Sequence, residues 1–155
     1  MNLITIDEAE LLSMMAVQKH AGEQARAAWG ELYVRHRRYL YVVVSRAYGS
    51  FLGENGTIDL VVDTFRRAYE WAGRQQNADV VRSQFSTDNP DSTRRKVLGW
   101  LGAIAESLFK DRFRTHAIDS TRHDEFLEEW KSRQDVFEFL RDLNLTNLLS
   151  VTTGD

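Results

Sequence analysis

Helical periodicity, almost uninterrupted by proline, is the feature that most constrains this chain. Its 155 residues include a single proline, Pro90, and long stretches place apolar residues three and four positions apart. Proline breaks helices, and this spacing puts apolar side chains on one helical face. We therefore expect helices in nearly every segment and no strand-rich region. The predicted fold class is all-α, a compact bundle of four to five helices.

Capping residues and glycines divide the pattern into segments. Thr5 with Glu8 has the form of a capping box, and Thr57 is a second N-cap candidate. Gly49 and Gly73 are expected to end helices. We expect helices over about 5–20, 23–48, 57–72, 93–114 and 121–149, a turn in GSFLGENG (49–56), and a polar loop over 74–92 with a short helical piece near 79–85.

Composition excludes several classes of protein. The absence of cysteine removes disulfides, thiolate metal sites and cysteine nucleophiles. The N-terminal sequence MNLITIDEAELL carries acids where a signal peptide has lysines, and no stretch is apolar enough to cross a bilayer. We therefore expect a cytoplasmic protein with no membrane partner. No hydrolase, phosphate-loop or Glu-x-x-His motif occurs, so we expect no enzyme, catalytic site, metal or cofactor.

One rival interpretation is a helical enzyme or metal protein. His116, Asp119 and His123 would cluster if they lay on one helix, although they fit a polar connector better. Metal analysis of the purified protein would separate these alternatives.

Two neighbouring acids mark the outer face of the predicted third helix. Asp59 and Asp63 are four residues apart, so they share one helical face. On these residues alone, we favour a solvated stripe with an acid in the first turn, where the helix dipole favours it, completed by Arg66, Arg67 and Glu70.

Positive charge gathers in the predicted fourth helix, although the net charge of the chain is −3. Cations near a helix start are unfavourable, so their presence there points to an external anion such as phosphate. An aromatic side chain beside them, Trp100, would stack on unpaired bases. The alternative is a solvated basic face with Trp100 partly in the core. The six cations between residues 92 and 116 are Arg94, Arg95, Lys96, Lys110, Arg112 and Arg114, against two acids, Glu106 and Asp111.

Three motifs in order resemble region 2 of bacterial sigma factors, especially the extracytoplasmic-function type. MMAVQKHAGEQARAAWGELYVRHRRYLYVVVSRAYG is similar to that family's first long helix. DLVVDTFRRAYEWA is similar to the segment that grips core RNA polymerase. WLGAIAESLFKDRFR is similar to the promoter-reading helix. The resemblance covers about Met14 to Arg114.

The resemblance implies a transcription initiation factor with two binding surfaces. The first would bind the coiled coil of the polymerase's largest subunit, with Asp59 and Asp63 exposed toward its basic residues. The second would hold the nontemplate strand of the promoter's minus-ten element as it melts, while a loop pocket accepts a flipped base. The implied polymerase-binding set is Asp59, Leu60, Asp63, Thr64, Phe65, Arg66 and Arg67. The implied DNA-binding set is Arg94, Arg95, Lys96, Trp100, Ser107, Lys110, Arg112 and Arg114.

The remaining expectations concern domains and partners. The resemblance implies a region 2-like domain over 1–118, with an extra N-terminal helix, and an acidic helical extension or linker over 119–155. No helix-turn-helix pattern follows Arg114. The chain is therefore either a fragment or a stand-alone sigma-like protein whose acidic tail masks the basic face. An anti-sigma regulator is a further implied partner. The alternative function is a sigma-like module that binds polymerase or a regulator without reading DNA.

Overall fold

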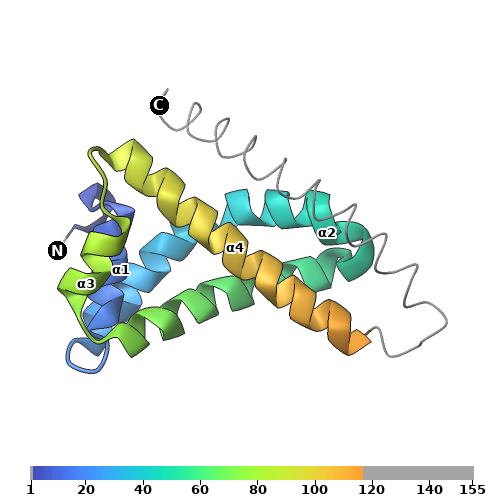
Figure 1. Ribbon diagram of the computed structural model, residues 1–155, viewed down its shortest axis with the longest axis horizontal. Helices are drawn as coiled ribbons and strands as arrows, with labels where there is room; N and C mark the ends of the chain where they lie inside the picture. Colours follow the sequence, from blue (N-terminus) through green and yellow to red (C-terminus); the bar gives the residue numbers. More distant parts are fainter. Residues whose placement is uncertain (1, 117–155) are drawn as a thin grey trace. The chain divides into compact units, whose positions relative to one another are not determined.

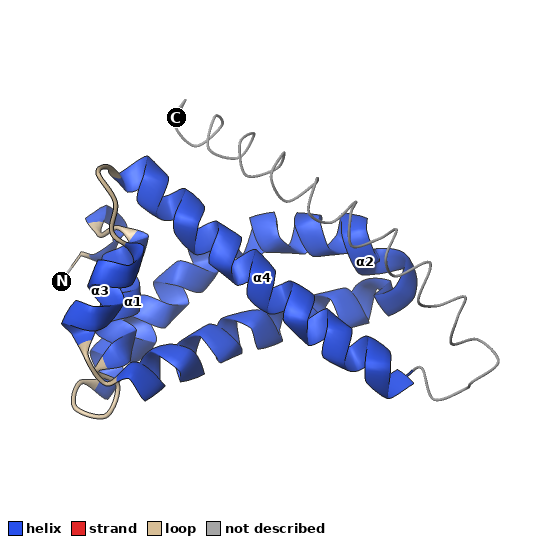
Figure 2. Ribbon diagram, viewed as in Figure 1, coloured by secondary structure: helices blue, strands red, loops and turns tan. Residues whose placement is uncertain are grey.

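Helices make up nearly all of the described chain. The computed structural model describes residues 2–116, and the side chains of residues 2–113. No strand occurs within this range, which confirms the all-α prediction there (Figures 1 and 2). The predicted helix at 121–149 and the extension over 119–155 lie outside the described residues. The elements are η1 (Leu3–Thr5), α1 (Glu8–Ala16), α2 (Gly22–Gln75), α3 (Ala78–Phe85) and α4 (Pro90–His116).

The residues divide into two units that interleave along the chain. The first unit joins the residues up to Arg38 with Phe65–Leu101. The second joins Tyr39–Thr64 with the described residues from Gly102. Helices α2 and α4 therefore contribute residues to both units.

A single glycine interrupts α2. Gly53 has φ 70° and ψ 177°, a conformation that glycine adopts far more readily than other residues. The sequence predicted an eight-residue turn over 49–56, but helix extends to both sides of Gly53. The prediction that Thr57 caps a new helix is also wrong. The helix has already resumed there, and the Thr57 hydroxyl donates to the Gly53 carbonyl at 2.7 Å.

Short polar side chains set the other helix starts. Asp7, not Thr5, caps α1, because its Oδ1 accepts from the Glu10 amide at 2.9 Å. Asn77 accepts from the amides that begin α3, which occupies the predicted short helical piece. Helix α4 begins at Pro90 rather than near Thr93, since proline fits the first helical position and Asn89 accepts from the Ser92 amide at 2.9 Å.

Each unit has its own apolar core. In the first unit, α1 packs beside α3 (Figure 1), and both supply fully buried residues such as Leu11 and Val81. In the second unit, Tyr48 stacks on Phe109 with ring centroids 3.7 Å apart and planes 12° from parallel. Burial of each such side chain contributes about 1.5–3 kcal/mol, so these contacts hold the charged faces described below in place.

Candidate functional site

The two predicted acidic contacts differ in their surroundings. Asp59 is exposed on α2. Asp63 accepts a hydrogen bond from Arg112 of α4 within the second unit, and the two side chains are 32% and 28% exposed. The predicted pair of free carboxylates is therefore one solvent-facing acid and one acid already bound to a predicted DNA-binding residue.

Three members of the predicted polymerase-binding set are core residues. Leu60, Thr64 and Phe65 are fully buried, and the Thr64 hydroxyl donates to the Leu60 carbonyl at 2.8 Å. The motif that resembles the polymerase-binding segment includes them because inward-facing and outward-facing positions alternate along an amphipathic helix. Their burial corrects the expected contact set. The members with accessible side chains are Asp59, Asp63, Arg66 and Arg67.

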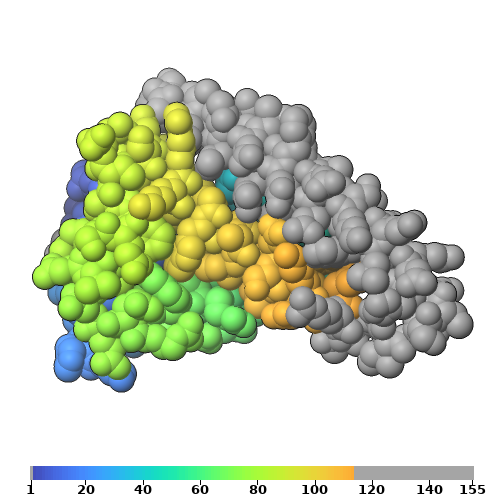
Figure 3. All heavy atoms as spheres, viewed as in Figure 1, coloured from blue at the N-terminus to red at the C-terminus, as the bar shows by residue number. Residues whose placement is uncertain are grey.

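The cations at the start of α4 also differ from one another in exposure and contacts. Arg95 and Lys96 are exposed, and side chains from this segment reach the surface of the first unit (Figure 3). Arg94 instead places its Nε 3.8 Å from Oε1 of Glu8, whose side chain is 3% exposed. The Arg94 guanidinium is therefore engaged by a buried carboxylate of its own chain, and its contact with phosphate stays a prediction.

Glu8 is the centre of a buried charge cluster in the first unit. Its Oε2 lies 3.4 Å from His36 Nε2 and 3.5 Å from Arg35 Nη1. Burial alone would raise the pKa of Glu8. The hydrogen bond and charge of His36, with the charges of Arg35 and Arg94, outweigh burial and hold that pKa below its usual value. Glu8 therefore stays ionised and joins α1 to α2 and α4.

Sequence reasoning missed this role for Glu8, which it assigned to a capping box. The available signal was position: Glu8 lies three and four residues before Leu11 and Leu12, on the face that α1 buries. A buried acid on that face needs a cation. His36 is buried and contacts Glu8 through Nε2, whereas its buried Nδ1 has no partner among the described residues.

Trp100 packs in an aromatic cluster of the first unit. Its ring centroid lies 5.0 Å from Trp71 and 5.0 Å from Phe85 of α3, in edge-on and tilted arrangements. The side chain is half-buried. This placement agrees with the alternative that Trp100 anchors its helix, while part of the ring remains accessible.

Two of the four DNA-binding candidates of the second unit, Lys110 and Arg112, are engaged by acids. Lys110 Nζ lies 3.5 Å from Oε1 of Glu106, and Arg112 donates to Asp63. Ser107 is exposed. Arg114 belongs to α4, but its side chain lies outside the described residues, as does that of His116.

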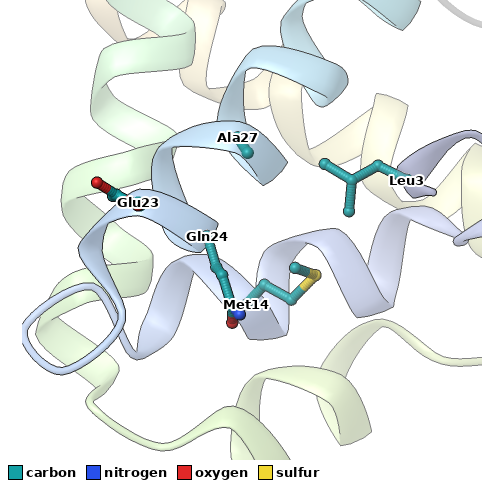
Figure 4. A pocket seen from close by; sticks show the side chains of 5 residues that line it. All are labelled: Leu3, Met14, Glu23, Gln24 and Ala27. Atoms are coloured by element: carbon teal, nitrogen blue, oxygen red, sulfur yellow. The ribbon is translucent and has the colours of Figure 1, made fainter. Parts of the chain in front are cut away.

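A hollow of about 240 Å³ lies at the surface of the first unit. Figure 4 shows the five side chains that line it. None was predicted as a site residue, and they do not combine a nucleophile with a base. Its lining residues are Leu3, Met14, Glu23, Gln24 and Ala27.

The described residues were also considered as metal ligands and as bilayer-spanning helices. Between residues 2 and 116, no group of three or more histidines and carboxylates is arranged to hold a metal ion. None of the helices in that range combines the length and apolar character needed for a bilayer span. The chemistry offered by the described charged faces is binding through ion pairs.

Comparisons with protein-family models, with curated proteins and with solved structures found no match to this chain.

Proposed function

We propose that this chain is a sigma-like transcription initiation factor that binds core RNA polymerase and contacts promoter DNA in the cytoplasm. It would have no active site of its own, since polymerase performs the chemistry. The proposal rests on three motifs that occur in the order typical of sigma region 2, from Met14 to Arg114.

The observation that carries the proposal is the amphipathic organisation of the segment 59–67. Leu60, Thr64 and Phe65 fix the segment to the cores, while Asp59, Arg66 and Arg67 remain exposed. A helix with charged groups on its outer side suits recognition of another helical surface, because complementary charge gives specificity and speeds encounter. The coiled coil of the polymerase's largest subunit is the proposed partner.

The start of α4 supplies the proposed contact with DNA. Arg95 and Lys96 are exposed, and the half-buried Trp100 follows one turn later. Exposed cations neutralise phosphates and release counterions, while an accessible aromatic ring can stack on unpaired bases. The nontemplate strand of a melting promoter presents both groups.

A pull-down with purified core RNA polymerase tests the polymerase contact. Asp59→Arg should reduce the retained polymerase at least roughly tenfold, because it sets like charges against each other at the interface. Glu54→Arg is the matched control, since Glu54 is also an exposed acid of the second unit. Asp63 is left unchanged because its replacement would also break the contact with Arg112. Equal retention by wild type and Asp59→Arg would overturn the proposal.

A second candidate function is a sigma-like module that binds polymerase or an anti-sigma regulator without reading DNA. The observation that favours it is the engagement of Arg94, Lys110 and Arg112 by acids of the same chain. Arg95→Glu with Lys96→Glu separates the two functions. Only the transcription-factor proposal expects this double variant to lose DNA binding while it keeps its affinity for polymerase.

A further inference from the structure

Apolar side chains are open to solvent where η1 lies against the start of α2 in the first unit. Among the described residues, Ile4 and Val34 are the most exposed of the large apolar side chains, at 76% and 61%. Arg35 donates to the carbonyl oxygens of Leu3 and Ile4 at 2.6 Å and 3.2 Å, and so holds η1 beside this part of α2. Apolar surface of this kind marks contact with another protein.

The same face contains both a projecting side chain and a hollow. Val34 projects from α2, and Ala27 lies two helical turns before it on the same side. The hollow of about 240 Å³ beside Ala27 is lined also by Leu3 and Met14 (Figure 4). It has room for a valine side chain, and the flexible thioether of Met14 can adapt to one. Val34 of a second chain therefore fits this hollow.

Opposite charges lie at the two ends of the face. Glu23 and Arg38 are both exposed, and fifteen residues of helix separate them by about 22 Å. Ala27 follows Glu23 by four residues, and Val34 precedes Arg38 by four. At 100° per residue, these positions all fall within about 60° around the helix axis. When two copies of the segment lie antiparallel, Ala27 therefore faces Val34 and Glu23 faces Arg38.

We propose that the pairing face, formed by η1 and residues 23–38 of α2, binds the same face of a second copy of this chain. The two segments run antiparallel about a twofold axis, so each contact occurs twice. Val34 of each copy fills the hollow of the other, and the ion pairs between Glu23 and Arg38 fix the direction. The face is small beside the interfaces of permanent dimers, so the dimer dissociates on dilution. This inference goes beyond the proposed function and uses none of its binding residues.

Sedimentation velocity of the full chain over a wide range of concentration tests the inference. The weight-average sedimentation coefficient of wild type should rise from the monomer value toward the dimer value. Val34→Asp should weaken dimerisation at least roughly tenfold, because it places two carboxylates in apolar hollows. Val80→Asp is the matched control, since Val80 is also an exposed valine of the first unit but lies on α3. It should dimerise as wild type does.

Charge exchange tests the direction of the pairing. Glu23→Arg and Arg38→Glu should each weaken dimerisation roughly threefold or more at low salt, because like charges then meet. The double variant, Glu23→Arg with Arg38→Glu, should recover the wild-type affinity. A parallel arrangement would set two copies of position 23 against each other, so the double variant would then recover nothing. Circular dichroism confirms that each variant remains helical.

Engineered cysteines provide a measurement that leaves the charges and the fold unaltered. The chain contains no cysteine, so introduced thiols have no competitor. Ala27→Cys and Val34→Cys are prepared separately and mixed under mild oxidation. The mixture should form a disulfide-linked dimer, because positions 27 and 34 face each other. Each variant alone should react at least roughly tenfold more slowly, since two copies of one position are offset by about 10 Å, beyond the Cα separation that a disulfide allows.

The outcomes are separate from those of the proposed function, because the chain is studied without polymerase or DNA. A wild-type chain that stays monomeric at the highest concentration overturns the inference and leaves the face to a different partner. Dimerisation that Val34→Asp does not weaken also overturns it, because the copies then meet elsewhere. Crosslinking of the mixture at the rate of either cysteine variant alone overturns the antiparallel pairing.

Discussion

Arg94, Arg95 and Lys96 are consecutive residues whose surroundings differ completely. Arg94 turns toward the buried Glu8, whereas Arg95 and Lys96 extend into solvent. A helix rotates by about 100° per residue, so neighbours in a charged run face different sides. Charge type alone therefore does not assign a residue to a ligand. Direction on the helix and the presence of a buried counter-charge decide its role.

The buried charge cluster around Glu8 leads to a prediction about stability. Glu8→Gln should lower the free energy of unfolding by about 2 kcal/mol at neutral pH, because it leaves Arg35 and Arg94 beside a buried neutral group. The depressed pKa of Glu8 fixes the sign of the pH dependence. Its contribution is present above pH 4.5, the usual value for glutamate, and is lost as the pH falls through the lower folded-state pKa.

Urea unfolding at several pH values measures this effect. The unfolding free energies of wild type and Glu8→Gln should differ at neutral pH and converge in acid. Glu70→Gln is the control, since Glu70 is exposed on α2 and its substitution should change stability by less than about 0.5 kcal/mol. A constant difference across the pH range would contradict the assigned role of Glu8.

At the scale of the elements, α2 depends on one residue for its change of direction. Gly53 combines a positive φ with an extended ψ, whereas the other residues of α2 have helical backbone angles. The helix resumes immediately, with Thr57 bonded back to the Gly53 carbonyl. A side chain at position 53 would meet no neighbour, so any penalty there comes from backbone strain rather than from a clash.

Two glycine substitutions on α2 isolate that strain. Gly53→Ala should lower the free energy of unfolding by about 1–3 kcal/mol, because alanine strongly disfavours this backbone conformation. Gly30→Ala should raise it by about 0.5–1 kcal/mol, since alanine favours a helix interior and a Cβ at Gly30 also meets nothing within 4 Å. Urea unfolding measures both. A neutral Gly53→Ala would show that the interruption of α2 does not require glycine.

The elements also show what periodicity can predict and where it stops. The apolar stripe of α2 and the short helix α3 follow from spacing, because burial of one face imposes it. The residue at which each helix starts does not follow from spacing, since Asp7 and Asn89 lie near Thr5 and Thr93 and all four are residues that can cap a helix. The eight-residue segment 49–56 around Gly53 combines three glycines with residues that tolerate a helix, so its sequence alone does not distinguish a turn from a short interruption of a helix.

At the scale of the whole molecule, the sequence predicts which segments are charged better than it predicts which charged side chains are accessible to a partner. The net charge of −3 hides a basic α4, and that contrast can be read directly. The pairing of Arg94 with Glu8 and of Arg112 with Asp63 joins residues far apart in the chain. Single-sequence patterns carry no information on such contacts. The set of accessible charged residues is therefore smaller than the predicted set of binding residues, and its members lie in both units.

The exposed cations at the start of α4 lead to a prediction about the salt dependence of DNA binding. Each phosphate contact to a single strand contributes about 0.7 to the slope of log affinity against log salt. Replacing both Arg95 and Lys96 by glutamine should therefore reduce the slope by about 1.4. Arg94→Gln should leave the slope nearly unchanged and lower the melting temperature instead, because its guanidinium offsets the buried Glu8. Anisotropy titrations over a range of salt concentrations, with thermal unfolding of the same variants, measure both effects. A larger change in slope for Arg94→Gln than for the double variant would return Arg94 to the phosphate-binding surface. It would also imply that the Glu8 cluster opens when nucleic acid binds.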